Sequence, residues 1–322
     1  MDLLSDLLHE AGLRRRLLDL RRLGPATALQ FPCEKSIGLH VVTHGRLWLH
    51  APSLGVPLAL DAGDIAVMAR GCVHVLSTMP SLDGAEVTPA VASPSQAGAA
   101  GDAARAASGS DAPSVVISGA YQLWNTPLHP FFGEIPEWFV MRADEIPKLG
   151  PLALAVGLLD GEVNDPELGA ETVVHGLLDV IFTHLLRAIV KRRADGGAGW
   201  SHAVRDPQVR QAIAEMHRDC ARAWSLESLA AIVGVSRTGL AERFRQAMGD
   251  TPMSYLRTVR MQRAIRLLSE STLNLEQVAQ EVGYQDAFSF SKVFKREVGV
   301  SPRDFRRQDE QDKQLAWRFK AG

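Results

Sequence analysis

Histidine side chains recur near the start of the chain at spacings that suit a shared site. His40 and His44 lie four residues apart in a stretch typical of a β-strand, so we expect their side chains on one face. Imidazole nitrogen is a good ligand for zinc, iron, nickel or copper, and His74 is a third candidate ligand. The residues leave a second interpretation open, in which ordinary hydrogen-bonded histidines hold no metal.

The cysteines suggest thiol chemistry rather than cross-links. Cys33, Cys72 and Cys220 are an odd number without CxxC spacing, which indicates neither a disulfide framework nor a thiolate zinc site. Cys72 lies two residues from His74, and a charged imidazole lowers the pKa of a neighbouring thiol, so Cys33 and Cys72 are candidates for redox sensing. Buried, inert thiols are the alternative, and Cys220 has no assigned role.

Two segments near the C-terminus repeat one pattern. Each has a short helix, a turn glycine, a longer helix with a central phenylalanine, a terminating glycine and then Ser/Thr-Pro. Ala230 lies four residues before Gly234, and Ala279 lies four residues before Gly283. Steeply crossing helices need a small side chain there and glycine supplies the turn, so the pattern predicts two helix-turn-helix motifs. A linking helix over roughly 253–269 would let both recognition helices read successive major-groove segments.

Residues 205–308 closely resemble the DNA-binding domain of the AraC/XylS family of transcription regulators. The second repeat, GYQDAFSFSKVFKR over 283–296, followed by GVSP over 299–302, matches that family's signature nearly throughout. The resemblance implies a regulator that binds double-stranded promoter DNA. It also implies RNA polymerase as a partner and a homodimer, and most members of the family activate transcription.

Carried over residue by residue, this resemblance assigns DNA contacts to both recognition helices. Arg243 would pair with guanine and Glu242 with cytosine, whereas Arg245, Lys295 and Arg296 would contact phosphate. A merely solvated helix face is the alternative for each charge taken singly. The DNA-binding candidates are Ser236, Arg237, Thr238, Ala241, Glu242, Arg243, Arg245, Asp286, Ala287, Ser289, Ser291, Lys292, Lys295 and Arg296. The residues expected in the core are Leu240, Phe244, Tyr255, Leu256, Phe290 and Phe294.

The N-terminal half resembles a cupin barrel. Residues 63–74, GDIAVMARGCVH, match the second cupin motif, which ends in a metal-ligand histidine, except that Ala69 stands at the proline position. The resemblance implies that His40, His44 and His74 meet inside the barrel. The usual glutamate ligand has no counterpart, which argues against a dioxygenase. The same half resembles the sensor domain of an AraC-family subgroup that includes an activator responding to reactive chlorine species through cysteines.

The elements that position these residues form an α+β chain of two domains. We expect a cupin-like β-barrel with flanking helices first and an all-α domain with two helix-turn-helix motifs second. Residues 1–23 are expected to be helical, and an apolar helix over 171–193 either belongs to the core or pairs two subunits. The expected boundaries are 1–194 for the sensor and dimerisation domain, with a flexible loop at about 80–114, then 195–204 for a glycine-rich linker, 205–308 for the DNA-binding domain and 309–322 for a tail.

Charge is divided unevenly along the 322 residues. Residues 1–199 hold 15 Lys and Arg against 22 Asp and Glu, and residues 200–322 hold 20 against 15, so net charges of −7 and +5 combine into the total of −2. The basic half suits nucleic acid. The composition is that of an ordinary globular protein, and no apolar run or signal peptide points to a membrane, so a cytoplasmic location is expected.

Together these observations favour a sequence-specific DNA-binding transcription regulator over an enzyme. Its cupin-like domain would sense a small molecule, a metal or an oxidant. No cofactor is certain, and a divalent transition metal in the cupin domain is the candidate. The alternative is a metal-dependent cupin enzyme fused to a helical DNA-binding module. The residues leave the effector, the promoter sequence and the direction of regulation open.

Overall fold

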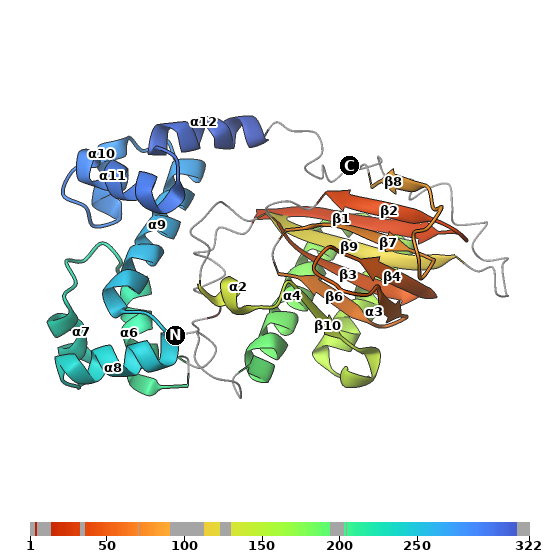
Figure 1. Cartoon of the computed structure of the whole chain (residues 1–322), viewed down its shortest axis with the longest axis horizontal. Helices are drawn as coiled ribbons and strands as arrows, with labels where there is room; N and C mark the ends of the chain where they lie inside the picture. The colour runs from red at the N-terminus through yellow and green to blue at the C-terminus, as the bar shows by residue number, and fades with distance from the viewer. Residues whose placement is uncertain are drawn as a thin grey trace. The chain divides into compact units, whose positions relative to one another are not determined.

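The computed structural model describes residue 4 and residues 14–32, 36–69, 71–90, 113–122, 130–193, 203 and 205–313 (Figure 1). The chain divides into a β-rich unit and a helical unit, which confirms the predicted two-domain α+β architecture.

Two five-stranded sheets make up the β-rich unit. One has the strand order β1-β9-β3-β6-β10 and the other β5-β4-β7-β2-β8. Paired strands are antiparallel, except that β2 and β8 run parallel. The strands are β1 Arg14–Leu23, β2 Ala28–Pro32, β3 Ser36–His44, β4 Arg46–His50, β5 Leu58–Asp61, β6 Ile65–Met68, β7 Val73–Ser77, β8 Val87–Pro89, β9 Ser114–Gln122 and β10 Trp138–Met141.

The two sheets pack face to face around one apolar core. Val42 and Met68 from the first sheet and Leu49 and Leu76 from the second belong to the same buried cluster. Residues 36–42 of β3 are all buried, as is typical of a strand covered on both faces. The core therefore lies between the sheets, with β3 in the middle of one of them.

The expected cupin-like fold class is confirmed, but its sheets do not close into a barrel. Among the described strands, β1 and β10 end the first sheet and β5 and β8 end the second, so both sheets remain open. Face-to-face packing buries the alternating apolar side chains of both sheets without closure, which removes the need for a barrel.

The expectation of a helix over residues 1–23 is also wrong for residues 14–23, whereas Leu4 is helical. Arg14–Leu23 forms β1, which pairs antiparallel with β9. Leucines at mixed spacings fit more than one period, and the backbone ladder to β9 outweighs local helix propensity. A register shift between Arg15 and Leu17 interrupts this ladder. Residues 1–3 and 5–13 lie outside the part that the structure describes.

Part of the segment expected as a flexible loop at about 80–114 forms a strand. Val87–Pro89 forms β8 beside β2, and the Ala90 N–H donates to the Gln30 carbonyl at 2.7 Å. The edge of β2 thus supplies backbone partners that a sequence poor in large apolar residues does not itself provide. The next strand, β9, begins at Ser114. Residues 91–112 lie outside the described ranges.

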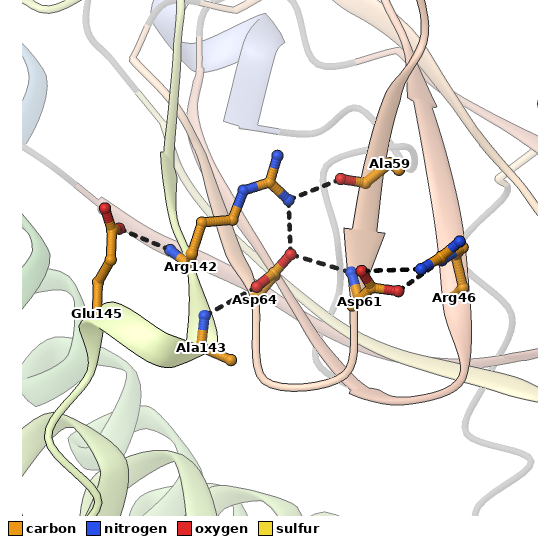
Figure 2. A network of polar contacts seen from close by, with 7 residues as sticks. All are labelled: Arg46, Ala59, Asp61, Asp64, Arg142, Ala143 and Glu145. Carbon is orange, nitrogen blue, oxygen red and sulfur yellow. Dashed lines mark hydrogen bonds and ion pairs between the residues drawn. The ribbon is translucent and has the colours of Figure 1, made fainter.

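A buried carboxylate anchors the turn before β6 to the end of β10 (Figure 2). Asp64, 3% exposed, accepts hydrogen bonds from the Asp61 and Ala143 N–H groups and from the Arg142 guanidinium, at 3.0, 2.9 and 2.7 Å. The same guanidinium donates to the Ala59 carbonyl at 2.8 Å. Because every partner is already in place, this part of the cupin-like motif has a structural role.

Helices follow the strands of this unit, namely the 3₁₀ helix η1 Ala143–Glu145, α3 Pro151–Asn164 and α4 Ala170–Arg193 up to Ile189. The short helix α2 Pro130–Glu134, which precedes β10, groups with the helical unit. Helix α4 confirms the apolar helix expected over 171–193. Ile181, Leu185 and Ile189 are fully buried along it. Among the described helices, its stretch Thr172–Arg192 alone is long and apolar enough to cross a membrane. A helix in the core of a protein can have the same length and composition.

The helical unit contains the predicted repeats. Its helices within 205–313 are α6 Pro207–Arg218, α7 Leu226–Val233, α8 Arg237–Met248, α9 Pro252–Glu270, α10 Leu275–Glu281, α11 Ala287–Val298 and α12 Pro302–Lys313. Helix α9 is the linking helix expected over roughly 253–269, and it runs between the two motifs (Figure 1). Helix α12 continues past the expected boundary at 308, because Asp309 is buried and accepts a hydrogen bond from Ser269 of α9 at 2.7 Å.

Helix α9 joins two small cores. It contacts α6 and α8 of the first motif's half and α10, α11 and α12 of the second. The side chains expected in the core are all at most 1% exposed, and they are Leu240, Phe244, Tyr255, Leu256, Phe290 and Phe294. Both motifs are therefore held on one shared helix.

Candidate nucleic-acid interface

Four polar side chains start the helices of the two motifs. Ser225 caps α7 and Ser236 caps α8, while Asn274 caps α10 and Asp286 caps α11. Each side-chain oxygen accepts a hydrogen bond from the N–H group three residues later, which satisfies a donor that the first helical turn leaves free. Two predicted DNA contacts, Ser236 and Asp286, therefore also fix where the recognition helices begin.

The turns of the two motifs have the same geometry. Gly234 and Gly283 have φ angles of +73° and +77°, in the left-handed region that favours glycine. The residue after each glycine donates its N–H to the backbone carbonyl of the buried alanine five residues earlier. These bonds run from Val235 to Ala230 at 3.0 Å and from Tyr284 to Ala279 at 2.8 Å. The two predicted helix-turn-helix motifs are confirmed.

Helix α8 turns its predicted contact residues to solvent. Its buried side is formed by Leu240, Phe244 and Ala247. The exposed candidates are Arg237, Thr238, Glu242, Arg243 and Arg245, and Ala241 is partly buried beside them. The face that remains open is polar and mostly cationic.

Two cations of α8 are paired with carboxylates. Arg243 Nη1 lies 3.2 Å from Asp206 Oδ2, while Asp206 Oδ1 caps α6. Arg237 Nη1 lies 3.0 Å from Glu227 Oε1. An exposed pair such as Arg243–Asp206 contributes about 0.2–1 kcal/mol, less than the roughly 1–3 kcal/mol of a bidentate contact with guanine. DNA can therefore displace Asp206 from Arg243.

The N-terminus of α11 already holds two carboxylates. Asp286 Oδ1 accepts from the Ser289 N–H at 2.7 Å and Oδ2 from the Ser289 hydroxyl at 2.9 Å, and these bonds lower the pKa of Asp286. Glu276 Oε2 accepts from the Ala287 N–H at 3.1 Å. Both negative charges are favourable at this end of the helix dipole, so a DNA phosphate is not needed there.

The remaining candidates of α11 lie along its accessible side. Ser289, Lys292, Lys295 and Arg296 are exposed, and Ala287 and Ser291 are partly buried. Arg296 pairs with Glu297 at 2.7 Å. Within the described residues, no ion pair engages Lys292, Lys295 or Arg245 of α8, so these ammonium and guanidinium groups are available to phosphate.

One residue that connects the two motifs was not predicted. Arg260 of α9 donates from Nε to the Cys220 carbonyl at 2.8 Å and from Nη2 to the Arg222 carbonyl at 2.9 Å. Its guanidinium lies 5.7 Å from the centre of the Tyr284 ring. Arg260 thus links the loop after α6 to the turn of the second motif. Its spacing alone is that of any surface arginine on a helix, so the sequence held no signal for it.

Gly283 completes this junction. A Cβ atom at Gly283 would lie 2.5 Å from the Ala221 carbonyl oxygen and 2.7 Å from Arg260 Nη2. A Cβ atom at the equivalent Gly234 would meet nothing within 4 Å. The turn of the second motif therefore lies directly against the backbone that follows α6.

A second residue without an assigned role is Phe288, which is 81% exposed in the first turn of α11. The signal for it is present in the sequence. Phe290 and Phe294 define the buried side, and Phe288 lies about 200° around the helix from Phe290.

In the β-rich unit, two of the three predicted histidines meet. His40 Nε2 lies 2.8 Å from His74 Nε2, and both side chains are at most 3% exposed. His40 Nδ1 lies 2.8 Å from the Ser118 hydroxyl and His74 Nδ1 lies 3.0 Å from the Cys72 carbonyl. Burial lowers the pKa of His74 to about 4. Burial first, and the charge of His74 second, lower the pKa of His40 well below its usual value.

These contacts determine where the protons lie on the two neutral rings. The Cys72 carbonyl only accepts, so His74 Nδ1 carries a hydrogen and His74 Nε2 must accept. His40 Nε2–H then donates to His74, and His40 Nδ1 accepts from the Ser118 hydroxyl. The rings of Phe31 and Trp138 lie beside the pair, 5.3 and 4.9 Å from the His74 ring.

Comparisons with known proteins agree with both units. The family model described as Cupin matches residues 2–191, and the model described as Helix-turn-helix domain matches residues 229–308. A putative AraC-like transcription regulator from Streptomyces lividans is 28% identical over 307 residues, 95% of this chain and 98% of that protein. The chain belongs to the AraC-like transcription regulators with a cupin domain.

Two further likenesses cover part of this AraC-like regulator. The RCS-specific HTH-type transcriptional activator RclR of Escherichia coli is 38% identical over 110 residues, 34% of this chain and 38% of that protein. The solved C-terminal domain of AraT, a response regulator from Geobacillus stearothermophilus, is 33% identical and covers 32% of this chain and 86% of its own, with a TM-score of 0.32. The alternative of a metal-dependent enzyme finds no support, because relatives that span nearly the whole chain are described as putative AraC-like transcription regulators.

Two of the three histidines that were expected as metal ligands in the AraC-like regulator come together, and the third does not. His44 is exposed, because a register shift in β3 between Val42 and His44 breaks the alternation that would keep it on the face of His40. His40 Nε2 and His74 Nε2 face each other and each Nδ1 has a hydrogen-bond partner, so these two predicted ligands meet, and metal binding by them stays a prediction. In the part of the chain that is described, no three His, Cys, Asp or Glu side chains gather as metal ligands do.

Of the two cysteines proposed for redox sensing, the structure describes Cys72. Cys72 is half-buried, and its thiol donates to the Met68 sulfur at 3.7 Å. Cys33 lies outside the described residues. Cys220 is buried in the helical unit of the regulator.

Proposed function

We propose that this AraC-like regulator activates transcription from a promoter that it binds as a homodimer. One observation carries the DNA-binding part of the proposal. Two matching helix-turn-helix motifs, joined by α9, leave the polar and cationic sides of α8 and α11 open to solvent. DNA-bound regulators of this architecture place the second helix of each motif in the major groove.

The contact residues divide into two kinds. Arg243 and Glu242 read base edges, because a guanidinium matches guanine and a carboxylate accepts from the cytosine amino group. Arg245, Lys295 and Arg296 bind phosphate, which gives affinity without sequence information. The remaining predicted contacts line the same exposed helix faces.

We expect activation to involve contact with RNA polymerase at the promoter. The regulator would act in the cytoplasm, where its promoter lies. The test begins with selection of genomic fragments by the purified full chain, followed by footprinting. In vitro transcription from the selected promoters should rise when the regulator is added. Transcription that falls would make it a repressor, and the absence of any selected sequence would remove sequence-specific binding altogether.

A homodimer is supported by the exposed apolar residues of two helices. Val173 and Val180 of α4 are 45% and 44% exposed, and Leu154 and Leu158 of α3 are 54% and 63% exposed. Such residues on helix surfaces lower the free energy of association when a second copy covers them. Two copies would double the number of recognition helices on one promoter.

Sensing is proposed for the interior of the cupin domain. The buried Trp138 indole N–H has no acceptor among the described residues, and it lies next to the neutral pair His40 and His74. A small polar ligand between the sheets would supply that acceptor. Such a ligand regulates only if it binds the DNA-competent and incompetent states with different affinity.

An oxidant is the second candidate effector, favoured by the contact between the Cys72 and Met68 sulfurs. Oxidation of Cys72 would place a polar group at the edge of the core. Promoter transcription in vitro should then respond to hypochlorite with the wild-type chain and not with Cys72→Ser. Equal responses of the two proteins would remove Cys72 as the sensor.

A further inference from the structure

Phe288 is the one exposed aromatic side chain among the described residues. It is 81% exposed, whereas Phe290 and Phe294 of the same helix are fully buried. Nothing in the fold requires an aromatic ring there, because the Asp286 cap starts α11 and the opposite side of the helix packs the core. Phenylalanine is also a weaker helix former than alanine. The ring is therefore free to serve an intermolecular contact.

The place of Phe288 in α11 points to DNA bases. It is the second residue of the second recognition helix, and N-terminal residues of such a helix reach base edges. Lys292, one turn further along, and Lys295 are exposed cations that suit the flanking phosphates. The helix thus presents an apolar tip with positive charge behind it.

In the major groove, one kind of group on the base edges suits the apolar ring of Phe288. Hydrogen-bond donors and acceptors fill the groove edge of every base pair, and the C5-methyl group of thymine is its apolar feature. The carboxylates of Asp286 and Glu276 already occupy the helix N-terminus, which keeps a phosphate from that position. We propose that Phe288 reads a thymine by packing its ring against the C5-methyl group.

This proposal rests on DNA binding by α11, and the experiment separates the two. Footprinting of the full chain first defines the operator. Each thymine of the operator is then replaced singly by deoxyuridine, which removes the methyl group and leaves base pairing unchanged. Dissociation constants are measured by fluorescence anisotropy for the wild type, Phe288→Ala and Phe288→Leu.

The wild type should lose about fourfold in affinity at one or two deoxyuridine positions, the factor that corresponds to one buried methyl group. Phe288→Ala should bind the thymine and deoxyuridine operators equally, and Phe288→Leu should keep part of the discrimination. Lys292→Ala is the matched control on the same helix face. It should weaken binding to both operators by the same factor and so preserve the discrimination.

Two results would overturn the reading of thymine. The first is that the wild type binds every deoxyuridine operator as tightly as the thymine operator. The second is that Phe288→Ala retains full affinity and discrimination while promoter transcription in vitro falls, which would assign Phe288 to a contact with the polymerase. A wild type that selects no operator contradicts DNA binding itself, and that outcome is distinct from both.

Discussion

Arg243 and Lys295 both lie on open faces of recognition helices, yet their replacement should have different effects. Arg243→Ala should weaken binding to the operator by roughly 1–3 kcal/mol and leave binding to random DNA nearly unchanged, since it removes a base contact. Lys295→Ala should weaken binding to all sequences and reduce the salt slope by about one unit. Dissociation constants on operator and random DNA at several salt concentrations distinguish the two effects.

Asp206 provides the control for Arg243. Asp206→Asn keeps an oxygen to cap α6 and removes the charge that holds Arg243 in the free protein. This variant should bind the operator more tightly than the wild type. Equal losses on operator and random DNA for Arg243→Ala would count against its role in reading bases.

His40 and His74 should make folding sensitive to acid. The unfolded chain binds protons on these rings below a pH of about 6.5, whereas the folded chain resists protonation of His74 until about 4. The free energy of unfolding therefore falls as the pH drops from about 6.5 to about 4. His217 of the helical unit, whose pKa burial also lowers to about 4, adds to this trend.

His74→Gln isolates the contribution of one ring. The glutamine amide can donate to the Cys72 carbonyl and accept from His40, and it does not titrate. Urea unfolding between pH 7 and 4 should show a pH dependence smaller by about one proton than in the wild type. His44→Gln, at an exposed position of β3, should keep the wild-type dependence. An unchanged slope in His74→Gln would mean that the pKa of His74 is the same in the folded and the unfolded chain.

The turns of the two motifs offer a matched pair of substitutions. Gly234→Ala forces alanine into the left-handed region, which costs roughly 1–2 kcal/mol. Gly283→Ala adds a clash with the Ala221 carbonyl and Arg260, and overpacking of this kind costs about 1–3 kcal/mol more. Urea unfolding should therefore rank Gly283→Ala as the less stable protein. Equal losses would mean that the loop after α6 yields to the added methyl group.

Local sequence signals predicted the helical elements well. The caps, turn glycines and buried phenylalanines of α7 to α11 depend on neighbours within one or two turns, so their spacing alone located both motifs. The β-rich unit depends on pairing between distant segments. The strand β1 forms because β9 lies beside it, and the register shift before His44 has no local signature. The expectation of a helix over 1–23 was wrong for residues 14–23, and His44 does not join His40 and His74, for these reasons.

Within the candidate interface, too, local features could be predicted from the sequence and contacts between distant residues could not. The exposed faces of α8 and α11 follow from helical periodicity, so the predicted contacts lie where the sequence indicated. The pairing of Arg243 with Asp206 and the bonds of Arg260 to the loop after α6 join residues more than 35 positions apart in sequence. Contacts of that range arise from packing and could not be predicted.

The part of the chain that binds DNA has only a modest positive charge, with +5 in residues 200–322 against −7 in residues 1–199. Tight promoter binding should therefore depend on two copies acting together. Val180→Glu, which places a charge on the exposed apolar side of α4, should yield monomers in sedimentation experiments and weaken operator binding. Val56→Glu is the matched control, because Val56 is 75% exposed in a turn. Dimers that persist in Val180→Glu would place the subunit contact elsewhere.

Arg260 bonds to the Cys220 and Arg222 carbonyls, and the Gly283 turn lies against Ala221. These contacts hold the two helix-turn-helix motifs of one subunit at a fixed spacing along DNA. Two motifs at a fixed spacing bind only when their sub-sites have the matching rotation around the DNA helix. One extra base pair between the two sub-sites turns the second by about 34–36° and moves it by about 3.4 Å. Binding to an operator with that insertion should collapse to the affinity of one sub-site, whereas an equal insertion between the sites of two subunits should be tolerated better.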